Sequence, residues 1–435
     1  MAQESSNMSI PLKILFLSEN FPPETNAAAT RVFERACYWV DAGHHVTIIT
    51  TAPNFPDGKV FSGYKNSWRQ VESISGIRVV RVKTFIAPNQ GMIRRTLDFL
   101  SFMVTGVWFG LFEAKPDVVA ATSPQFFTAV GGWILARLRR VPFIFELGDL
   151  WPASIVAVGI LKPGFILSVI EKLELNLYHR SEAIVSLTHA FKDNLVMRGV
   201  ESNKIAVIPN GVDLWRYGLH DRDKDLSMKW NLSGYFIVGY IGTHGMAHGL
   251  GNVLDAAEEL RNNDQIRFLL VGAGAERDKL MLAAKNRGLK NVIFIPSQTK
   301  SSMPAVWSLC NIALVHLKKD PLFASVIPSK IFESMAMGLP ILLAAPEGEA
   351  SKILSSEKAG LHIPAEDPKA LADAIESLFN DPDGLKELAD NSFSAAPRYS
   401  REMQAHHMMT VIQLVVQRRG SEAGDHSLDE LGDNS

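Results

Sequence analysis

The chain has 435 residues, of which 47% are apolar and 21% charged, and 44 basic against 46 acidic side chains leave a net charge of −2. This length is too great for a single hydrophobic core and predicts two domains of ordinary size. The near-neutral balance argues against a general attraction to nucleic acid. Cys37 and Cys310 lie far apart in apolar stretches, which indicates reduced core residues. The first residues are polar, without the apolar core of a secretory signal, which favours the cytoplasm.

Short runs typical of buried strands alternate with helical stretches along the first half of the chain. A helix is expected at 31–42, and the apolar stretch 97–112 is too short to cross a bilayer. This alternation predicts a doubly wound α/β domain with a largely parallel sheet. The expected strands are 13–18, 45–51, 76–82, 117–121, 143–146 and 183–187.

A second α/β series starts after the polar run 220–227, which is expected to be an exposed loop. Its strands are separated by helices, so a second doubly wound domain is predicted. Ligands of such folds bind at the carboxyl ends of the strands, which places the expected site in a cleft between the two sheets. The expected strands are 236–241, 267–271, 292–295, 312–316 and 341–345.

The segment Ile327–Pro346 holds the strongest candidate for a ligand site. It predicts a short buried helix at 329–337 with Pro328 at its start. Lys330 and Glu333 share a face of the first turns, where free amides attract an anion. Lys330 would meet a phosphate, and Glu333 would accept hydrogen bonds from a ribose diol. A partly buried Lys/Glu ion pair explains these charges equally well, so both interpretations stay open here.

Two glycine-rich loops follow strands of the second domain. The loop 242–251 (GTHGMAHGLG) precedes a helix, and its glycines would let backbone amides approach a phosphate closely. His244 and His248 could add donors or cap the helix, and without a third ligand nearby they form a weak metal pair. Gly272 and Gly274 form a second tight turn, which we expect beside a ligand.

Two further patterns favour structural interpretations. Arg277 occupies the third glycine position of a dinucleotide fingerprint, and no acidic residue ends the next strand, so NAD binding is disfavoured. Asp221, Asp223 and Asp225 alternate with basic residues in a polar run. This spacing is more typical of a solvated charge run than of a divalent-metal site.

Polar residues after two strands of the first domain are candidates for acceptor binding. Asp149 follows a buried strand and precedes the turn at Trp151, so its carboxylate could act as a base or anchor a hydroxyl, or could cap a helix. Glu24 and Asn26 lie in the corresponding loop after the first strand, where Asn26 could instead cap the loop.

Basic residues border apolar helical stretches in the first domain. Between Asn54 and Arg140 there are 12 Lys and Arg against five Asp and Glu. Arg94 and Arg95 precede the stretch 97–112, and the run 136–140 (ARLRR) is also basic. The pattern favours docking on an anionic membrane surface over a core helix with a solvated basic end.

Taken together, these motifs make the chain similar to the retaining glycosyltransferases of family four, which have the two-domain GT-B fold. The resemblance covers residues 12–415 and looks closest to bacterial transferases that build O-antigen, capsule or exopolysaccharide, including fucosamine transferases. The motifs that carry it are the loop after KILFLS, GHHVTIIT at 43–50, SLTHAFKDNL at 186–195, IPNGVD at 208–213, VGAGAERDKL at 271–280 and SKIFESMAMGLPIL at 329–342.

The resemblance implies an α/β protein with two Rossmann-like doubly wound domains facing a central cleft. Residues 1–210 would bind the acceptor and 211–399 the nucleotide sugar. A closing helix at 400–419 would cross back to the first domain, and the acidic tail 420–435 would be disordered.

The implied activity is retaining transfer of a hexosyl or N-acetylaminosugar group from a nucleotide sugar, UDP favoured over GDP, to a lipid-linked or oligosaccharide acceptor. The resemblance assigns catalysis to Lys330, Asp149 and Glu333, with no metal or cofactor. Acceptor-side residues would be Glu24, Asn26, Asp149 and Trp151. Donor-binding residues would be Gly242, Thr243, His244, Gly245, His248, Gly272, Gly274, Pro296, Ser297, Gln298, Ser329, Lys330 and Glu333.

The chain departs from the family pattern at three places. Ser325 occupies the position of the first acid of a paired-Glu motif, His248 stands where Lys is common, and Asn26-Ala27 replaces a glycine pair. These departures keep two alternatives open, a non-catalytic nucleotide-sugar-binding subunit of a polysaccharide assembly complex and a sugar-nucleotide epimerase or phosphorylase on the same fold. The expected location is the cytoplasm, peripheral at the inner face of the cell membrane.

Overall fold

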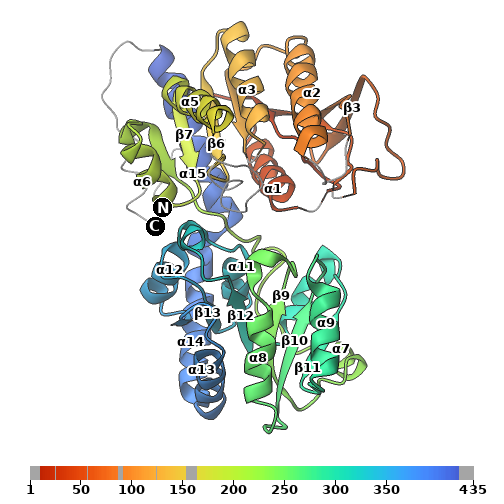
Figure 1. Ribbon diagram of the computed structural model, residues 1–435. Coiled ribbons are helices and arrows are strands. Elements are labelled where there is room, and N and C mark those ends of the chain that lie inside the picture. The colour runs from red at the N-terminus through yellow and green to blue at the C-terminus, as the bar shows by residue number, and fades with distance from the viewer. Residues whose placement is uncertain are drawn as a thin grey trace, which may run out of the picture. The chain divides into compact units, whose positions relative to one another are not determined.

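The computed structural model describes residues 10–24, 26–55, 57–86, 92–123, 125–152 and 164–420 (Figure 1). The chain forms two compact units. The first unit contains the described residues up to Ile208 together with those from Gln404 onward, and the second runs from Pro209 to Met403. The predicted disordered tail at 421–435 lies outside the described residues.

The first unit is built on an eight-stranded sheet with the order β3-β4-β2-β1-β5-β6-β7-β8. Neighbouring strands are parallel except β3, which pairs antiparallel with β4 at one edge. The strands are β1 (Lys13–Leu17), β2 (His45–Thr51), β3 (Arg69–Ile74), β4 (Ile77–Val82), β5 (Val118–Thr122), β6 (Phe143–Leu147), β7 (Ala183–Ser186) and β8 (Ile205–Val207).

Helices cover both faces of this sheet. One face packs against α1 (Ala27–Asp41) and the C-terminal helix α15 (Arg401–Gly420). The other face packs against α2 (Met92–Gly110), α3 (Phe126–Arg139), α5 (Phe165–Arg180) and α6 (His189–Met197). Figure 1 shows α2, α3 and α5 side by side. None of the helices in the described part of the chain is long and apolar enough to cross a membrane.

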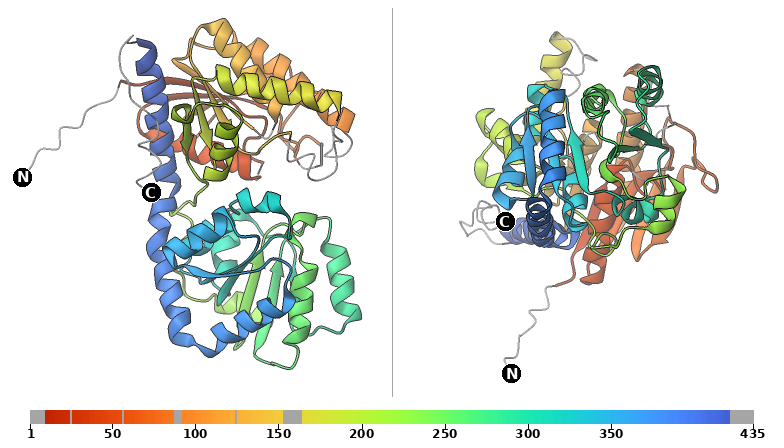
Figure 2. Two further views of the ribbon diagram at one scale, coloured as in Figure 1. Left: turned by 60° about the vertical axis from the view of Figure 1, so that its left-hand side comes forward. Right: turned by 90° about the horizontal axis from the view of Figure 1, so that it is seen from below.

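Helix α15 completes the core of the first unit. The backbone N–H of Arg401 donates to the Val212 carbonyl in the second unit, and from Gln404 onward the helix belongs to the first unit. Figure 2 shows this long helix. The predicted return of the closing helix is therefore confirmed. Its buried apolar side chains pack in one cluster with β1, β2 and α1, and they are Ala405, Met408, Met409, Val411, Ile412 and Val415.

The second unit has a six-stranded, fully parallel sheet with the order β11-β10-β9-β12-β13-β14. Its near-continuous apolar strands are typical of a sheet that is covered on both faces. The strands are β9 (Phe236–Ile241), β10 (Ile266–Val271), β11 (Val292–Ile295), β12 (Ile312–His316), β13 (Ile341–Ala344) and β14 (Gly360–Ile363).

Two groups of helices flank this second sheet. Helices α8 (Gly251–Glu259), α9 (Arg277–Asn286) and α13 (Pro368–Asn380) pack with one core cluster. Helices α10 (Met303–Trp307), α11 (Lys330–Ala336) and α12 (Glu349–Glu357) pack with the other. The remaining helices of this unit are α7 (Lys224–Lys229) and α14 (Pro382–Ala395), with 3₁₀ turns at Met246–His248, Lys300–Ser302, Pro321–Ser325 and Ala396–Tyr399, and one further 3₁₀ turn, Ser202–Lys204, lies in the first unit.

Most expected elements lie where the sequence predicts them, but three corrections are needed. The run 220–227 is not entirely loop, because the Asp223 carboxylate caps α7 by accepting from the Leu226 N–H at 2.9 Å. Strands β3, β8 and β14 were not predicted, because β3 alternates exposed and half-buried residues at the sheet edge and because β8 and β14 have only three and four residues. Helix α1 begins before residue 31, because Asn26 caps it at Ala27.

Each sheet has one point at which the strand order reverses. In the first sheet the chain leaves β1 toward β2 and returns to its other side at β5. In the second sheet it leaves β9 toward β10 and returns at β12. Open α/β sheets bind ligands outside the carboxyl ends of the strands at such a switch point. The loops after β1, β5, β9 and β12 are therefore the places to look for a site.

Candidate functional site

Two tightly packed loops form the carboxyl edge of the second sheet beside its switch point. The Gly242 N–H donates to the Val271 carbonyl at 2.9 Å, and the His244 N–H donates to the Ala273 carbonyl at 2.8 Å. Gly242 and Gly272 have φ angles of +144° and +150°. A Cβ on Gly272 would overlap the Gly242 carbonyl, so this approach requires glycine.

Lys330 brings a buried amine to these loops as the first residue of α11. Its side chain leaves the residue 9% exposed, and Nζ has no hydrogen-bond partner among the described residues. Nζ lies 3.6 Å from the centre of the Tyr240 ring and 2.9 Å from where a Cβ on Gly242 would lie. Burial lowers the pKa of Lys330 to about 7.

Glu333 lies one turn further along α11 without an ion pair to Lys330. The indole N–H of Trp307 donates to its Oε2 at 3.4 Å. Burial raises the pKa of Glu333 above its ordinary value, while Trp307 and Lys330 act against that rise. The structure therefore has no Lys330–Glu333 ion pair, and the amine of Lys330 has no hydrogen-bond partner among the described residues.

Three histidines surround this amine and are held neutral. Both ring nitrogens of the fully buried His244, and Nδ1 of His248, have no partner among the described residues. His316 lies at the end of β12, 2.7 Å from the His248 carbonyl and 2.8 Å from the Asn252 side chain. Burial lowers the pKa of each of the three histidines to about 4, and the charge of Lys330 acts in the same direction.

Arg277 supplies a second cation that sequence reasoning did not assign to the site. It is the first residue of α9, is half-buried and has an unpartnered Nε. Its charge lowers the pKa of His244, as that of Lys330 does. The sequence showed Arg277 only as a departure from a dinucleotide fingerprint. Its position at a helix start after a strand was the available signal.

Unpartnered buried nitrogens are the shared feature of these side chains. Nζ of Lys330, both ring nitrogens of His244, Nδ1 of His248 and Nε of Arg277 have no partner among the described residues. Burying polar groups without partners is costly. A ligand rich in anionic oxygen would satisfy the cationic donors, which matches a diphosphate.

The remaining predicted donor-side residues lie on the same edge with less distinctive surroundings. Gln298 donates from its side-chain amide to the Pro296 carbonyl at 2.9 Å. The Ser325 hydroxyl donates to the Leu322 carbonyl at 2.8 Å. Ser329 precedes α11 without a side-chain capping bond. The exposed residues of this group are Thr243, Gly274, Pro296 and Ser297, and Gly245 is half-buried.

No group of three metal-ligating side chains occurs among the residues that the structure describes. Asp223 is used as the cap of α7. The aspartate run 221–225 therefore has a structural explanation, as the sequence favoured.

In the first unit, the residues predicted to bind an acceptor have different surroundings. Each oxygen of Glu24 accepts two hydrogen bonds, from Asn20 and the Phe21 N–H on one side and from the Asn54 and Phe55 N–H groups on the other. Asn26 accepts from the Ala29 N–H at 2.9 Å as the cap of α1. Glu24 and Asn26 thus have evident structural functions.

Asp149 and Trp151 lie just after β6. The Trp151 ring stacks on the Phe126 ring at 4.8 Å between ring centres, and the backbone N–H of Trp151 donates to the Asp149 carbonyl at 3.0 Å. A hollow of about 460 Å³ is bordered by Leu150 and Pro152 together with residues of α5 and α6, but neither Asp149 nor Trp151 lines it. The acceptor function of these two residues therefore stays a prediction.

Glu146 holds the end of β6 in a buried ion cluster. Arg31 donates to it at 2.9 Å, and Arg35, one helical turn further along α1, donates to the same oxygen. Against the effect of burial, the two guanidinium groups lower the pKa of Glu146 to about 2. Sequence reasoning missed this cluster, although two arginines four residues apart on one face of a helix were a signal.

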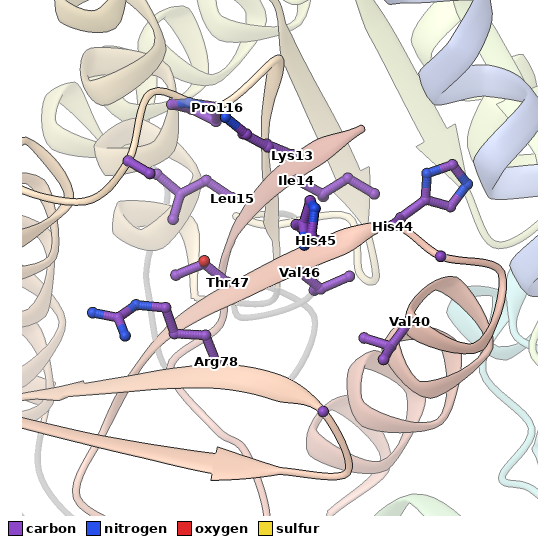
Figure 3. A pocket seen from close by; sticks show the side chains of 13 residues that line it. Lys13, Ile14, Leu15, Val40, His44, His45, Val46, Thr47, Arg78 and Pro116 are labelled. Atoms are coloured by element: carbon purple, nitrogen blue, oxygen red, sulfur yellow. The ribbon is translucent and has the colours of Figure 1, made fainter. Parts of the chain in front are cut away.

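A larger hollow of about 540 Å³ lies at the opposite edge of the first sheet (Figure 3). Lys13 and His45, the first residues of β1 and β2, border it together with His44 and Arg78. None of the predicted site residues lines it. Because it lies at the amino ends of the strands, it is not where this fold binds ligands.

Comparison with known proteins defines the class. Residues 26–211 match the family model "Glycosyl transferase 4-like domain", and residues 223–395 match "Glycosyl transferases group 1". The protein is therefore a glycosyltransferase with the GT-B fold, built from two Rossmann-like α/β domains. It belongs to family GT4.

Individual proteins agree with this assignment. The chain is 27% identical over 337 residues to WcaI of Escherichia coli K12, a glycosyl transferase named for colanic acid biosynthesis, with 75% of this chain and 82% of that one covered. Sucrose-phosphate synthase of Thermosynechococcus elongatus has a similar structure, with a TM-score of 0.72, 19% identity and coverage of 93% and 99%. Anabaena Alr3699/HepE, solved in complex with UDP, has a TM-score of 0.69, 18% identity and coverage of 93% and 100%.

Proposed function

We propose that the protein is a retaining glycosyltransferase that moves a sugar from a nucleotide sugar to an acceptor in bacterial surface polysaccharide synthesis. The observation that carries the proposal is the set of unpartnered buried nitrogens around Lys330. These donors lie at the switch point of a parallel sheet, where a diphosphate would satisfy them. Glu333 would then hold the ribose, as the sequence predicts.

The proposed chemistry depends on stabilising the leaving group. The Lys330 ammonium, the Arg277 guanidinium and the amides of the glycine loops would stabilise the charge that develops on the diphosphate. Transfer with retention needs no protein nucleophile when the acceptor hydroxyl attacks from the face that the leaving group vacates. Asp149 would orient that hydroxyl in the first unit. No metal or cofactor enters this proposal.

The relatives differ in the nucleotide that their names give. Alr3699/HepE was solved with UDP, and a Mycobacterium tuberculosis relative that is 22% identical over 371 residues is named GDP-mannose-dependent, so UDP over GDP stays a prediction from the sequence. WcaI is named for colanic acid biosynthesis, which supports a role in polysaccharide synthesis, while a lipid-linked or oligosaccharide acceptor stays a prediction. Transfer of a hexosyl or N-acetylaminosugar group, and the narrower similarity to fucosamine transferases in O-antigen synthesis, stay predictions.

A thermal-shift screen with UDP, GDP and their sugars tests the donor site. A ligand that binds only the folded state raises the melting temperature by mass action. We expect the largest increase with UDP or a UDP-sugar and its loss in Lys330→Ala. A Lys330→Ala variant with near-normal turnover would refute the catalytic assignment.

Product analysis separates the two alternatives. A non-catalytic subunit would bind the nucleotide sugar without hydrolysing or transferring it. An epimerase would convert its donor in the absence of any acceptor. Release of the nucleoside diphosphate that accelerates when an acceptor is added would support transfer over both.

We also propose that the first unit docks on an anionic membrane at its α2 and α5 side. Trp108 and Phe112 are 59% and 65% exposed, and their rings contact edge to face at 5.5 Å. Val104 lies one turn before them on the same face of α2. Helix α5 presents a second stripe, Phe165, Val169 and Leu173, at four-residue spacing. Basic residues at 94–95 and 137–140 flank these apolar surfaces.

Vesicle sedimentation tests this docking. We expect binding to phosphatidylglycerol vesicles but not to phosphatidylcholine vesicles, and a marked loss for Trp108→Glu/Phe112→Glu. Met281→Glu/Leu282→Glu, which charges exposed apolar residues on α9 of the second unit, is the matched control and should bind as the wild type does. Equal binding by all three proteins would exclude this surface.

A further inference from the structure

The switch point of the first sheet contains an acidic side chain that is not among the residues proposed to bind the donor or the acceptor. Glu19 is the second residue after β1, the strand at which the order reverses. It is only 7% exposed, and its Oε2 has no hydrogen-bond partner among the described residues. An unpartnered carboxyl oxygen buried to this extent is unfavourable unless a ligand satisfies it.

Hydrogen bonds hold the backbone around Glu19 in place, whereas the Oε2 atom of its carboxyl group is left for a ligand. The Glu19 carbonyl accepts hydrogen bonds from the hydroxyls of Thr50 and Thr51 at 2.9 and 3.0 Å. The side chain of Gln125, just after β5, donates to Asn20 at 3.1 Å and joins the two loops of the switch point. Glu19 is thus held rigidly at the place where this fold binds ligands.

Glu19 contrasts with Glu24, the acid that the sequence selected in the same loop. All the strong acceptor positions of Glu24 are taken by hydrogen bonds within the loops. Burial raises the pKa of Glu19 well above its ordinary value, the nearby carboxylates of Asp98 and Glu24 act in the same direction, and the charge of Arg95 acts against it. The unpartnered Oε2 of Glu19 is left to accept a hydrogen bond from a sugar hydroxyl.

We infer that Glu19, rather than Glu24, contacts hydroxyl groups of the acceptor sugar in the first unit. The inference rests on the proposed function, because it assigns the acceptor side of the same transfer. Glu19 binds and positions the acceptor through one or two hydrogen bonds, and it takes no part in donor binding. The ligand class is a polyol, which here means the terminal sugar of a glycan or glycolipid.

The test compares Glu19→Ala and Glu19→Gln with the wild-type chain on octyl β-D-glucoside, octyl β-D-galactoside and octyl N-acetyl-β-D-glucosaminide. Saturation-transfer NMR reports glycoside binding without turnover, and nucleotide-sugar hydrolysis without acceptor reports the donor site. We expect Glu19→Ala to weaken glycoside binding at least tenfold, Glu19→Gln to restore it to within threefold, and hydrolysis to stay unchanged. Glu113→Ala is the control, since this buried acid is bonded by Arg69 and Arg78 away from the switch point.

Each result of these measurements either supports or overturns the role inferred for Glu19. Glycoside binding by Glu19→Ala that equals the wild type overturns the inference, as does a wild-type chain that binds none of the three glycosides. A loss of melting temperature in Glu19→Ala that matches Glu113→Ala, with hydrolysis reduced in parallel, would show a structural role instead. Failure of the wild type to bind or hydrolyse any nucleotide sugar would count against the proposed function, and this is measured separately from glycoside binding.

Discussion

Binding of a nucleoside diphosphate to the second unit should draw a proton onto Lys330. The amine has a pKa of about 7 because it is buried without a partner. An adjacent diphosphate favours the charged form and should return the pKa toward its ordinary value. The charged fraction in the free protein is then about one half at pH 7 and about 1% at pH 9, so affinity should fall about 50-fold between them.

Calorimetry of UDP binding measures this linkage directly. At pH 8 the free amine is about 9% charged, so binding should take up about 0.9 proton. The apparent enthalpy should therefore differ between Tris and HEPES in proportion to their ionisation enthalpies. Lys330→Met should bind weakly at every pH and take up no proton through this position. Equal wild-type affinity at pH 7 and pH 9, with no buffer dependence, would refute the reasoning.

Lys330→Met and two other substitutions probe the stability and binding of the two units. Lys330→Met should raise the melting temperature at pH 7 by several degrees, as measured by differential scanning calorimetry. The reason is that the folded-state pKa of Lys330 is lowered to about 7, so the wild-type protein loses stability progressively as the pH falls from 10.5 to 7. Glu333→Gln should weaken UDP binding roughly tenfold by calorimetry, through loss of a charge-assisted hydrogen bond, and unchanged affinity would count against the ribose role. Glu146→Ala should destabilise the first unit by roughly 3–5 kcal/mol in urea titrations, because two buried guanidinium groups lose their partner. In the wild type the stabilisation from Glu146 is present above pH 4.5 and is lost as the pH falls toward 2, so acid titration of Glu146→Ala should lack that step.

The sequence predicted the regular elements well where apolar periodicity was strong. Strands β2, β9, β11 and β12 begin and end at the predicted residues. Strand β3 was missed because polar residues alternate along it at the sheet edge, and its pairing with β4 depends on a turn rather than on a buried face. The same local rules missed the cap at Asp223, since an aspartate in a charged run has no distinctive spacing.

The candidate donor site could be located from the sequence, but its chemistry could not. Lys330 and Glu333 were identified from their spacing at a helix start, and the choice between ion pair and free amine stayed open. The structure decides it because Tyr240 and Gly242, about 90 positions earlier, pack against the amine. Contacts between residues so far apart in sequence are set by sheet topology, which local patterns do not encode.

Topology also distinguishes the two acidic residues of the first loop. Glu19 and Glu24 look alike in sequence, and only the hydrogen bonds from Asn54 and Phe55 show that Glu24 is already occupied. Both donors come from the loop after β2, which the sheet brings beside β1. An acidic residue near the end of a strand therefore indicates where a ligand site lies in the sheet. The hydrogen-bond partners of each acidic residue then show which of them is available to a ligand.

The return of α15 has a consequence for how the protein is made. The core of the first unit needs residues from Ala405 to Val415, which leave the ribosome after the whole second unit has been synthesised. Translation proceeds at about 5–20 residues per second, so the last helix of the first unit is synthesised tens of seconds after the rest of that unit. The second unit is a continuous stretch of chain and can close its core first. The half of the protein that is translated first is thus the half that finishes folding last.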